Sequence, residues 1–329
     1  MAHLMKTRTL RQTALMAIGL LLTVMLTGCD QRELCYDHHH TANIKVIFDW
    51  TDAPDADVEG MTVMFYNDND PSAEPIRYDL GRDGGTVNLQ PGKWTAIAYN
   101  NDTETILLRG QESPTTLEAY TRKSTIEEGT QISTRSEMPR ASKAKDEPVI
   151  LEPDMLYGAI GEPLILGPND QSATLTLRPV PRVTEVEITI HDVPNLEYAS
   201  QFGGALSGLA SSVMMGSGAI GSGCVTEAFT CQVIDKTTLQ MKFRIFGHCP
   251  DDILNDHLLT IYAILSDGTK WYYNTDVTSK MHDARQEEQT EHHIEIDLEE
   301  LPIPEPIAQD SGLQPSVDTW QNIEIEINM

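Results

Sequence analysis

The chain has 329 residues, which at roughly 150 residues per domain suggests two domains behind any targeting segment. A hydrophobic content of 40% supplies enough apolar side chains for folded cores and argues against a disordered acidic chain. With 23 Lys and Arg against 50 Asp and Glu, the formal net charge is -27, so the surface repels phosphate backbones and nucleic acid is not expected as a partner.

The first residues have the layout of an export signal. Basic residues at Lys6, Arg8 and Arg11 precede an apolar run over residues 14–26 that is too short to span a bilayer as a helix. The run ends in Leu26-Thr27-Gly28-Cys29, which resembles the lipobox of bacterial lipoproteins. We therefore predict a lipoprotein signal peptide over residues 1–28, lipidation of Cys29 and a lipidated tether over residues 29–41; the alternatives are an ordinary cleaved signal and a buried apolar helix.

A period of two then dominates the apolar pattern. It predicts a half-buried strand whose apolar face carries Ile44, Val46, Phe48 and Trp50. Similar patterns predict strands over residues 61–66, 86–89, 94–99 and 105–108, separated by turn clusters such as Gln90-Pro91-Gly92. Strands at this short spacing favour an antiparallel sandwich over alternating strands and helices.

Residues 121–145 change character. They are rich in Ser, Thr and basic residues and poor in large apolar ones, which predicts a long exposed loop. A second series of strands is predicted over residues 174–177, 186–190, 239–246, 258–265 and 270–273, and Asp267-Gly268 predicts a type I′ hairpin turn. Residues 203–223 are glycine-rich and are interpreted as a short helix or packed loop that links two sheets.

These patterns predict an all-β protein of two tandem β-sandwich domains. The N-terminal domain is expected over residues 42–160, including the exposed loop at 121–145, and the C-terminal domain over residues 161–329. The chain ends on alternating Ile323, Ile325 and Ile327, which predict a last strand with one apolar and one acidic face.

Four cysteines follow Cys29, and an exported protein meets an oxidising compartment. Cys35, Cys224, Cys231 and Cys249 could therefore form disulfides without being required to do so. Cys224 and Cys231 are close enough in sequence to join adjacent strands or close a loop, so this pair is a candidate disulfide. The alternative is that both are buried free thiols.

Candidate chemical motifs are weak. Gly216 to Gly221 matches the dinucleotide-binding glycine pattern, but no β-α-β unit surrounds it. No nucleophile elbow, zinc-protease motif or phosphate-binding loop occurs in the sequence. We therefore expect no enzyme, no catalytic residues and no cofactor; the minor alternative is a secreted-type hydrolase.

Metal-binding patterns are equally incomplete. Asp37-His38-His39-His40 could place His38 and His40 on one side of an extended strand, but no second cluster at a defined spacing completes a ligand shell. The acidic residues around Asp52 and Asp68 lack the glycine and glutamate of a calcium-binding loop and are interpreted as turn residues. No metal site is predicted.

Several short segments occur in a distinctive order. They are Arg32 to His38 after the lipobox, Pro153 to Tyr157, Phe246-Gly247, Leu265 to Gly268, Asp276 to Thr278, and the ending from Gly312 through Trp320 into Ile325. In this order and spacing the chain resembles the fimbrillin-like lipoproteins of Bacteroidota. The resemblance implies two transthyretin-like Greek-key sandwiches and export as a lipoprotein. In fimbrial members it also implies polymerisation by strand exchange after a protease cuts behind an Arg in the N-terminal domain.

Strand exchange works because a donor strand satisfies the unpaired backbone groups and the apolar trough of an open groove. The last strand, with Trp320 in phase with Ile323, Ile325 and Ile327 on one apolar face, could be such a donor; alternatively it is a permanent edge strand of its own domain. The arginines Arg77, Arg82, Arg135 and Arg140 do not match a cleavage motif, which favours an uncut, permanently lipidated member.

We therefore expect a non-enzymatic, lipid-anchored protein of the outer membrane, exposed at the cell surface. It would act as an anchor or accessory subunit of fimbriae or in adhesion, with fimbrial subunits or a host or glycan ligand as partners. The alternative is a surface glycan-binding lipoprotein of a polysaccharide-capture system, for which Trp271 and Tyr273 could form a two-ring stacking patch.

Overall fold

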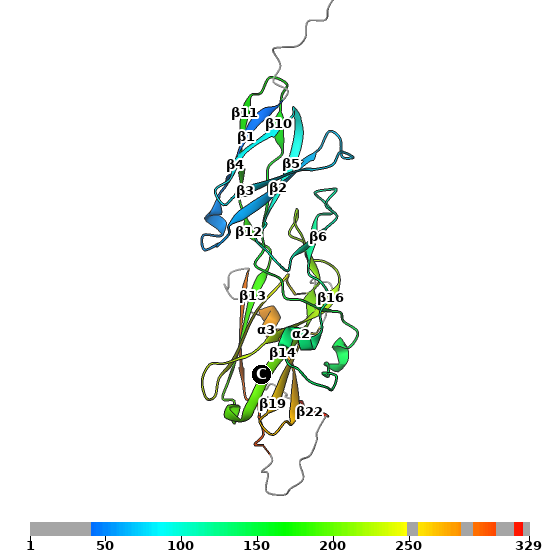
Figure 1. Ribbon diagram of the computed structural model, residues 1–329, viewed down its shortest axis with the longest axis vertical. Coiled ribbons are helices and arrows are strands. Elements are labelled where there is room, and N and C mark those ends of the chain that lie inside the picture. The colour runs from blue at the N-terminus through cyan, green and yellow to red at the C-terminus, as the bar shows by residue number, and fades with distance from the viewer. Residues whose placement is uncertain (1–40, 249–255, 284–291, 307–318, 325–329) are drawn as a thin grey trace, which may run out of the picture. The chain divides into compact units, whose positions relative to one another are not determined.

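A computed structural model describes residues 41–248, 256–283, 292–306 and 319–324 (Figure 1). The predicted signal peptide and most of the tether, with Cys29, His38 and His40, therefore lie outside the described residues, as do Ile325 and Ile327. No helix in the described ranges is long and apolar enough to cross a membrane.

Two sheets enclose the first core (Figure 1). One has the order β11-β1-β4 and consists of β1 (Ala42–Phe48), β4 (Gly85–Leu89) and β11 (Ser172–Leu177). The other has the order β12-β9-β5-β2-β3, with β10 (Leu164–Leu166) also on β5, and contains β2 (Gly60–Asn67), β3 (Ile76–Gly81), β5 (Gly92–Asn100), β9 (Tyr157–Ile160) and β12 (Val180–Pro181).

The first strand shows how sequence alternation builds this core. Along β1 the burial pattern is strictly alternating up to Val46, and Ile44 and Val46 pack with Val63 and Phe65 of β2 in one apolar cluster. The opposite face of β1 carries exposed Asn43 and Lys45. The predicted half-buried strand is therefore confirmed for Ile44, Val46 and Phe48, whereas Trp50 lies in a 3-10 turn after the end of the strand.

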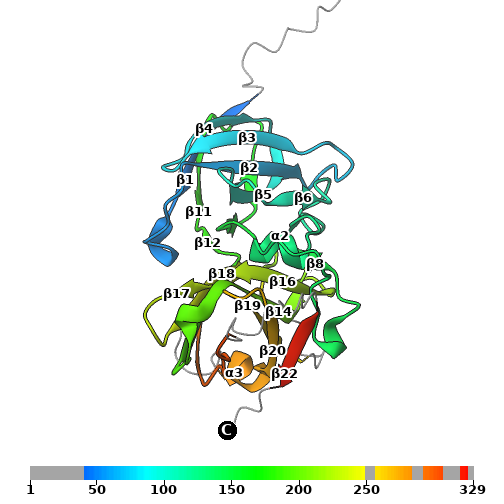
Figure 2. The same cartoon turned by 60° about the horizontal axis from the view of Figure 1, so that its bottom comes forward.

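Two further sheets enclose the second core (Figure 2). The four-stranded sheet has the order β17-β18-β13-β21, with β13 (Thr184–His191), β17 (Gln232–Val233), β18 (Leu239–Ile245) and β21 (His293–Glu299). The six-stranded sheet has the order β22-β20-β19-β14-β16-β8, with β8 (Val149–Ile150), β14 (Ala199–Ala210), β16 (Cys224–Thr230), β19 (Leu258–Leu265), β20 (Lys270–Asp276) and β22 (Trp320–Glu324).

A small third sheet and two short helices complete the described structure. The sheet has the order β15-β7-β6, with β6 (Leu107–Arg109), β7 (Glu118–Tyr120) and β15 (Ser212–Met214). The helices are α2 (Ile126–Thr130) and α3 (Thr278–Asp283), beside single 3-10 turns at η1 (Trp50–Asp52), η2 (Ser142–Ala144) and η3 (Leu196–Tyr198). The prediction of a nearly all-β protein is confirmed, whereas the transthyretin-like Greek-key assignment stays a prediction.

Strand pairing does not follow the expected division at residue 160. Strand β11 lies beyond that point in the sequence, yet it pairs in parallel with β1 and places Leu175 and Leu177 in the first core. In the other direction, β7 pairs with β15, and β8 pairs in parallel with β16 of the second six-stranded sheet. The segment between β5 and β9 therefore belongs structurally with strands that follow residue 183.

The glycine-rich segment is a strand and not the predicted helix or loop. Strand β14 is twelve residues long and pairs with both β16 and β19. Its glycines allow close approach, because a Cβ atom on Gly203 would lie 2.5 Å from Cβ of Thr130 and one on Gly204 would lie 2.3 Å from the ring of Phe229. Glycine here marks dense packing against the strand.

The Asp267-Gly268 hairpin is present between β19 and β20, but its turn is not type I′. Gly268 has a φ of +84°, while Asp267 is not among the residues with positive φ. The amide of Leu265 donates to the Thr269 carbonyl at 2.9 Å, and the Asp267 carboxylate accepts from the Thr269 amide at 2.9 Å. A longer connection with glycine in the left-handed region therefore replaces the two-residue turn.

Candidate functional site

The last described strand, β22, lies at the edge of the six-stranded sheet. It runs parallel to β20, with Trp320 opposite Lys270 and Ile323 opposite Tyr273 (Figure 2). No other described strand pairs with its outer edge. An edge strand presents unpaired N–H and C=O groups that can hydrogen-bond to a further strand.

The two large apolar residues of β22 pack on opposite faces of the sheet. Ile323 packs against the second core, whereas Trp320 packs against a separate cluster around Tyr262. The rings of Trp320 and Tyr262 meet edge to face, with centroids 5.5 Å apart. The prediction that Trp320 shares one apolar face with Ile323 is therefore wrong, because residues three apart in a strand point to opposite sides.

The cluster around Trp320 is covered by the segment predicted as an exposed loop. Ile126, Ile132 and Met138 are at most 5% exposed and pack with Tyr262, whose hydroxyl donates to the Pro139 carbonyl at 2.7 Å. The predicted loop at 121–145 is largely irregular and many of its polar side chains are exposed, but it is not exposed throughout. Its few large apolar side chains cover the outer face of the sheet.

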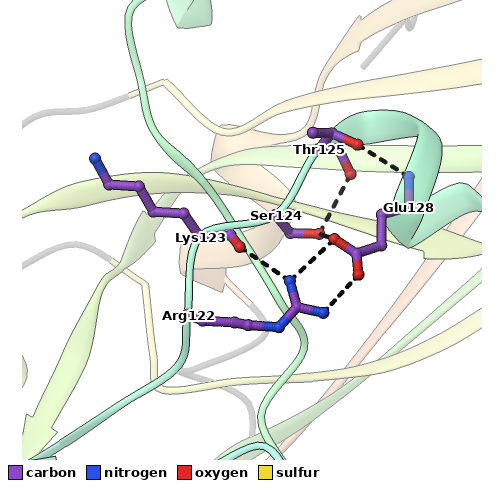
Figure 3. Close-up of polar contacts among 5 residues, drawn as sticks. All are labelled: Arg122, Lys123, Ser124, Thr125 and Glu128. Carbon is purple, nitrogen blue, oxygen red and sulfur yellow. Dashed lines mark hydrogen bonds and ion pairs between the residues drawn. The ribbon is translucent and has the colours of Figure 1, made fainter.

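Polar contacts order the start of this segment (Figure 3). The Thr125 hydroxyl accepts from the Glu128 amide at 3.2 Å and caps α2, while Arg122 binds the Glu128 carboxylate with distances of 2.5 and 3.1 Å. Hydrogen bonds from Arg122 and Ser124 lower the pKa of Glu128 to about 2. Thr125 is therefore the N-cap of α2, and Glu128 places a negative charge in its first turn, where the helix dipole favours it.

The first strand, β1, is hydrogen-bonded on both sides. It pairs in parallel with β11 and antiparallel with β4, and its apolar residues Ile44 and Val46 are at most 1% exposed. Loss of β1 would open a groove between two strands, which is the geometry that strand exchange requires. The described chain keeps β1 in that position.

The candidate cleavage arginines occupy different environments. Arg77 forms an exposed ion pair with Asp79 at 3.0 Å, and Arg82 lies 4.7 Å above the Trp50 ring. Arg140 donates to the carbonyls of Lys145 and Glu147 at 2.9 and 2.7 Å, while Arg135 is exposed. Arg82 and Arg140 thus have structural roles that a protease cut would disturb.

The candidate disulfide between Cys224 and Cys231 does not form. Cys224 begins β16 and Cys231 directly follows its last residue, so the extended strand separates them. Seven strand residues span about 23 Å, whereas the Cα atoms of a disulfide lie within about 7 Å. Burial raises the pKa of the Cys231 thiol, which favours its protonated form.

The aromatic patch considered for sugar stacking is not exposed. Tyr273 is 1% exposed and its hydroxyl donates to the Pro302 carbonyl at 3.2 Å. Trp271 is half-buried against the same core. These two rings therefore do not form a platform for a pyranose ring.

One group of residues was missed by sequence reasoning. Among the described residues, His248, His257 and His282 bring ring nitrogens within 4.8 Å of one another. Their spacing in the sequence is irregular, so no local motif signals that they meet. The predicted turn acids, such as Asp52, do not join a group of this kind within the described ranges.

Comparison with known proteins places the chain in a family. The family model described as "Domain of unknown function (DUF5119)" matches residues 28–230, which is more than half of the chain. The chain belongs to the DUF5119 family.

A curated relative of this DUF5119 chain is the "Putative fimbrium anchoring subunit Fim4B" of Bacteroides ovatus. The two are 28% identical over 197 residues, which cover 59% of this chain and 54% of that protein. The alignment thus spans about half the length of this relative. The relationship supports the resemblance to the fimbrillin-like proteins of Bacteroidota.

Solved structures share the fold. The crystal structure of a "putative adhesin" from Bacteroides ovatus has a TM-score of 0.57 at 22% identity, covering 85% of this chain and 99% of the other. One of "putative polysaccharide binding proteins" from Bacteroides thetaiotaomicron has a TM-score of 0.51 at 9% identity, covering 78% and 90%. At these identities the likeness concerns the fold alone.

Proposed function

We propose that this protein is a non-enzymatic, lipid-anchored subunit at the cell surface that anchors fimbriae or acts as their accessory subunit. The observation that carries the proposal is the sequence relationship to Fim4B, whose name assigns it to fimbrium anchoring. The fully paired β1 agrees with a subunit that keeps its first strand.

In this proposal the lipid is attached at Cys29 and holds the protein in the outer membrane. The apolar run over residues 14–26 ends three residues before this cysteine, as a lipoprotein signal does. A diacylated cysteine that also carries an amide-linked chain provides the two or more acyl groups that stable attachment needs. The partners are then neighbouring fimbrial subunits, or a host or glycan ligand reached through them.

Strand β22 is the proposed contact with another subunit. Its outer edge could accept a partner strand, or the strand itself could leave β20 and enter a neighbour's groove. The glycan-binding alternative is less well supported, because Trp271 and Tyr273 pack against the core.

The test is an unheated gel blot of outer membranes from the native host. Wild type is compared with a chain ending at Gln314, which lacks β22, and with a chain ending at Glu324, which retains it. We expect heat-sensitive ladders in wild type and in the Glu324 chain, and their loss in the Gln314 chain. Protease resistance of the Gln314 chain checks that it is folded.

A single monomer band in all three samples would contradict assembly through the last strand.

The same membrane fractions test the lipid anchor. Cys29→Ser should move the protein out of the membrane fraction, whereas the matched control Cys35→Ser should leave it there. Membrane retention of the Cys29→Ser variant would argue against lipidation at this residue.

A further inference from the structure

Three histidines from three separate segments meet beside the second six-stranded sheet. His248 follows β18 and bridges to Leu209 of β14, His257 directly precedes β19, and His282 lies in α3. Their ring centroids are 5.0, 5.3 and 5.7 Å apart. All three rings can thus present one nitrogen to a common point.

The group is built into the fold and not spread over its surface. His257 is 1% exposed and His248 is 8% exposed, while His282 is half-buried. The His257 amide donates to the Thr278 hydroxyl at 2.8 Å, and the His257 carbonyl accepts from the Val277 amide at 2.9 Å. These bonds fix the start of α3 relative to the start of β19.

Hydrogen bonding sets the tautomer of His257. Its Nδ1 lies 3.3 Å from the Ser207 carbonyl oxygen, which can only accept, so Nδ1 carries the hydrogen. Nε2 is then left with a lone pair. A histidine held through one nitrogen by a carbonyl, with the other nitrogen free to bind, is the usual arrangement of a metal ligand.

A carboxylate also lies near the group. Asp276 interacts electrostatically with His257 and would favour a cation there.

We propose that His248, His257 and His282 bind a Zn²⁺ ion that ties α3 to the six-stranded sheet. Three imidazole nitrogens with water in the fourth position are an established zinc ligand set. In a tetrahedral site, zinc–nitrogen bonds of about 2.0 Å place the ligand nitrogens about 3.3 Å apart. The ring nitrogens of the three histidines lie up to 4.8 Å apart, so they need to move closer together to bind the ion. His282, half-buried in the last turn of a short helix, is best placed to move. This inference does not rest on the fimbrial proposal.

The experiment is zinc titration of the purified full mature chain, made without a histidine tag and stripped of metal with a chelator. His38, His39 and His40 are replaced by Gln, so that the tether cannot contribute binding. Calorimetry gives the stoichiometry and affinity for Zn²⁺, Co²⁺ absorption reports the coordination, and thermal unfolding reports the coupling to stability.

We expect this tether variant to bind one equivalent of Zn²⁺ and to unfold at a higher temperature with the metal. Adding His282→Gln should weaken zinc binding by at least about tenfold, because even the loss of a residue that only orients a metal ligand reduces affinity by about that much. The matched control His191→Gln changes an exposed histidine of β13 outside the group and should bind like the tether variant.

Absence of zinc binding by the folded tether variant would overturn the proposal, as would unchanged affinity in a folded His282→Gln chain. His248→Gln is a second variant for the case in which His282→Gln does not fold. A cobalt spectrum in the tether variant with no imidazole ligation would overturn the proposal independently of any substitution.

Discussion

Glu227 is a carboxylic acid in the middle of β16 with 1% of its surface exposed. Its Oε1 atom has no hydrogen-bond partner among the described residues. Burial raises its pKa well above the usual value, and the nearby Glu152 carboxylate raises it further. The folded protein therefore retains a proton that the unfolded chain releases.

The raised pKa makes stability depend on pH. Because the folded state binds more protons than the unfolded state above about pH 4.5, the free energy of unfolding should fall as pH rises from there toward the folded pKa. Glu227→Gln removes this dependence, and at pH 7.5 we expect it to stabilise by about 1–3 kcal/mol. Urea unfolding at several pH values measures the difference.

Near pH 4.5 the variant and wild type should have similar stability. Exposed Glu162→Gln is the matched control and should change stability by less than about 0.5 kcal/mol at either pH. Equal stabilisation by Glu227→Gln at pH 4.5 and 7.5 would mean that packing, and not ionisation, causes the effect.

Gly204 shows how one missing side chain allows packing. The Phe229 ring occupies the space where its Cβ would lie, and that ring is itself stacked on Phe243 with centroids 3.9 Å apart. Gly204→Ala should therefore destabilise by about 1–3 kcal/mol, the cost of overpacking a core. Gly81→Ala is the control, because nothing lies within 4 Å of its added Cβ. Equal urea midpoints for the two variants would contradict this account.

At the scale of elements, alternation predicted about half of the strands of the two cores, including β1, β2 and β5, and missed others, such as β3, β16 and β21. It failed for β14, because the glycines that permit close contact with Thr130 and Phe229 remove the apolar pattern that marks a strand. It also did not show that residues 121–145 cover a sheet face, because a few apolar residues are enough for this and the sequence does not identify the face. Local patterns show that a residue prefers burial but not which surface buries it.

The candidate site was foreseen only in part for the same reason. The last strand was expected from Ile323, but its parallel pairing with β20 depends on a partner far away in sequence. The histidine group combines residues from three segments, so no spacing rule could find it. Contacts between distant segments decide both features.

At the scale of the whole molecule, the two cores exchange segments of chain. The first core needs β11, while β7 and β8 pair with strands that follow residue 183. Met64 and Ile97 of the first six-stranded sheet also pack with Val213 and Phe246 in one cluster. Residues 41–329 should therefore unfold as one cooperative unit.

Division of the chain at residue 160 tests this expectation. A fragment of residues 41–160 lacks β10, β11 and β12, and a fragment of residues 161–329 lacks β7, α2 and β8. We expect neither fragment to show a cooperative thermal transition by circular dichroism, whereas the intact chain melts in one step. A fragment that melts at the temperature of the intact protein would show that the cores are independent.

The position of β1 has a mechanical consequence. The chain enters β1 directly from its N-terminal segment, and hydrogen bonds hold this strand along both sides, to β11 and to β4. A force applied at the N-terminus and directed along the strand loads these bonds in shear, so many must break together. A strand pulled sideways from a sheet edge would instead separate one bond at a time. Tension applied at the N-terminus would thus reach a strand suited to resist it.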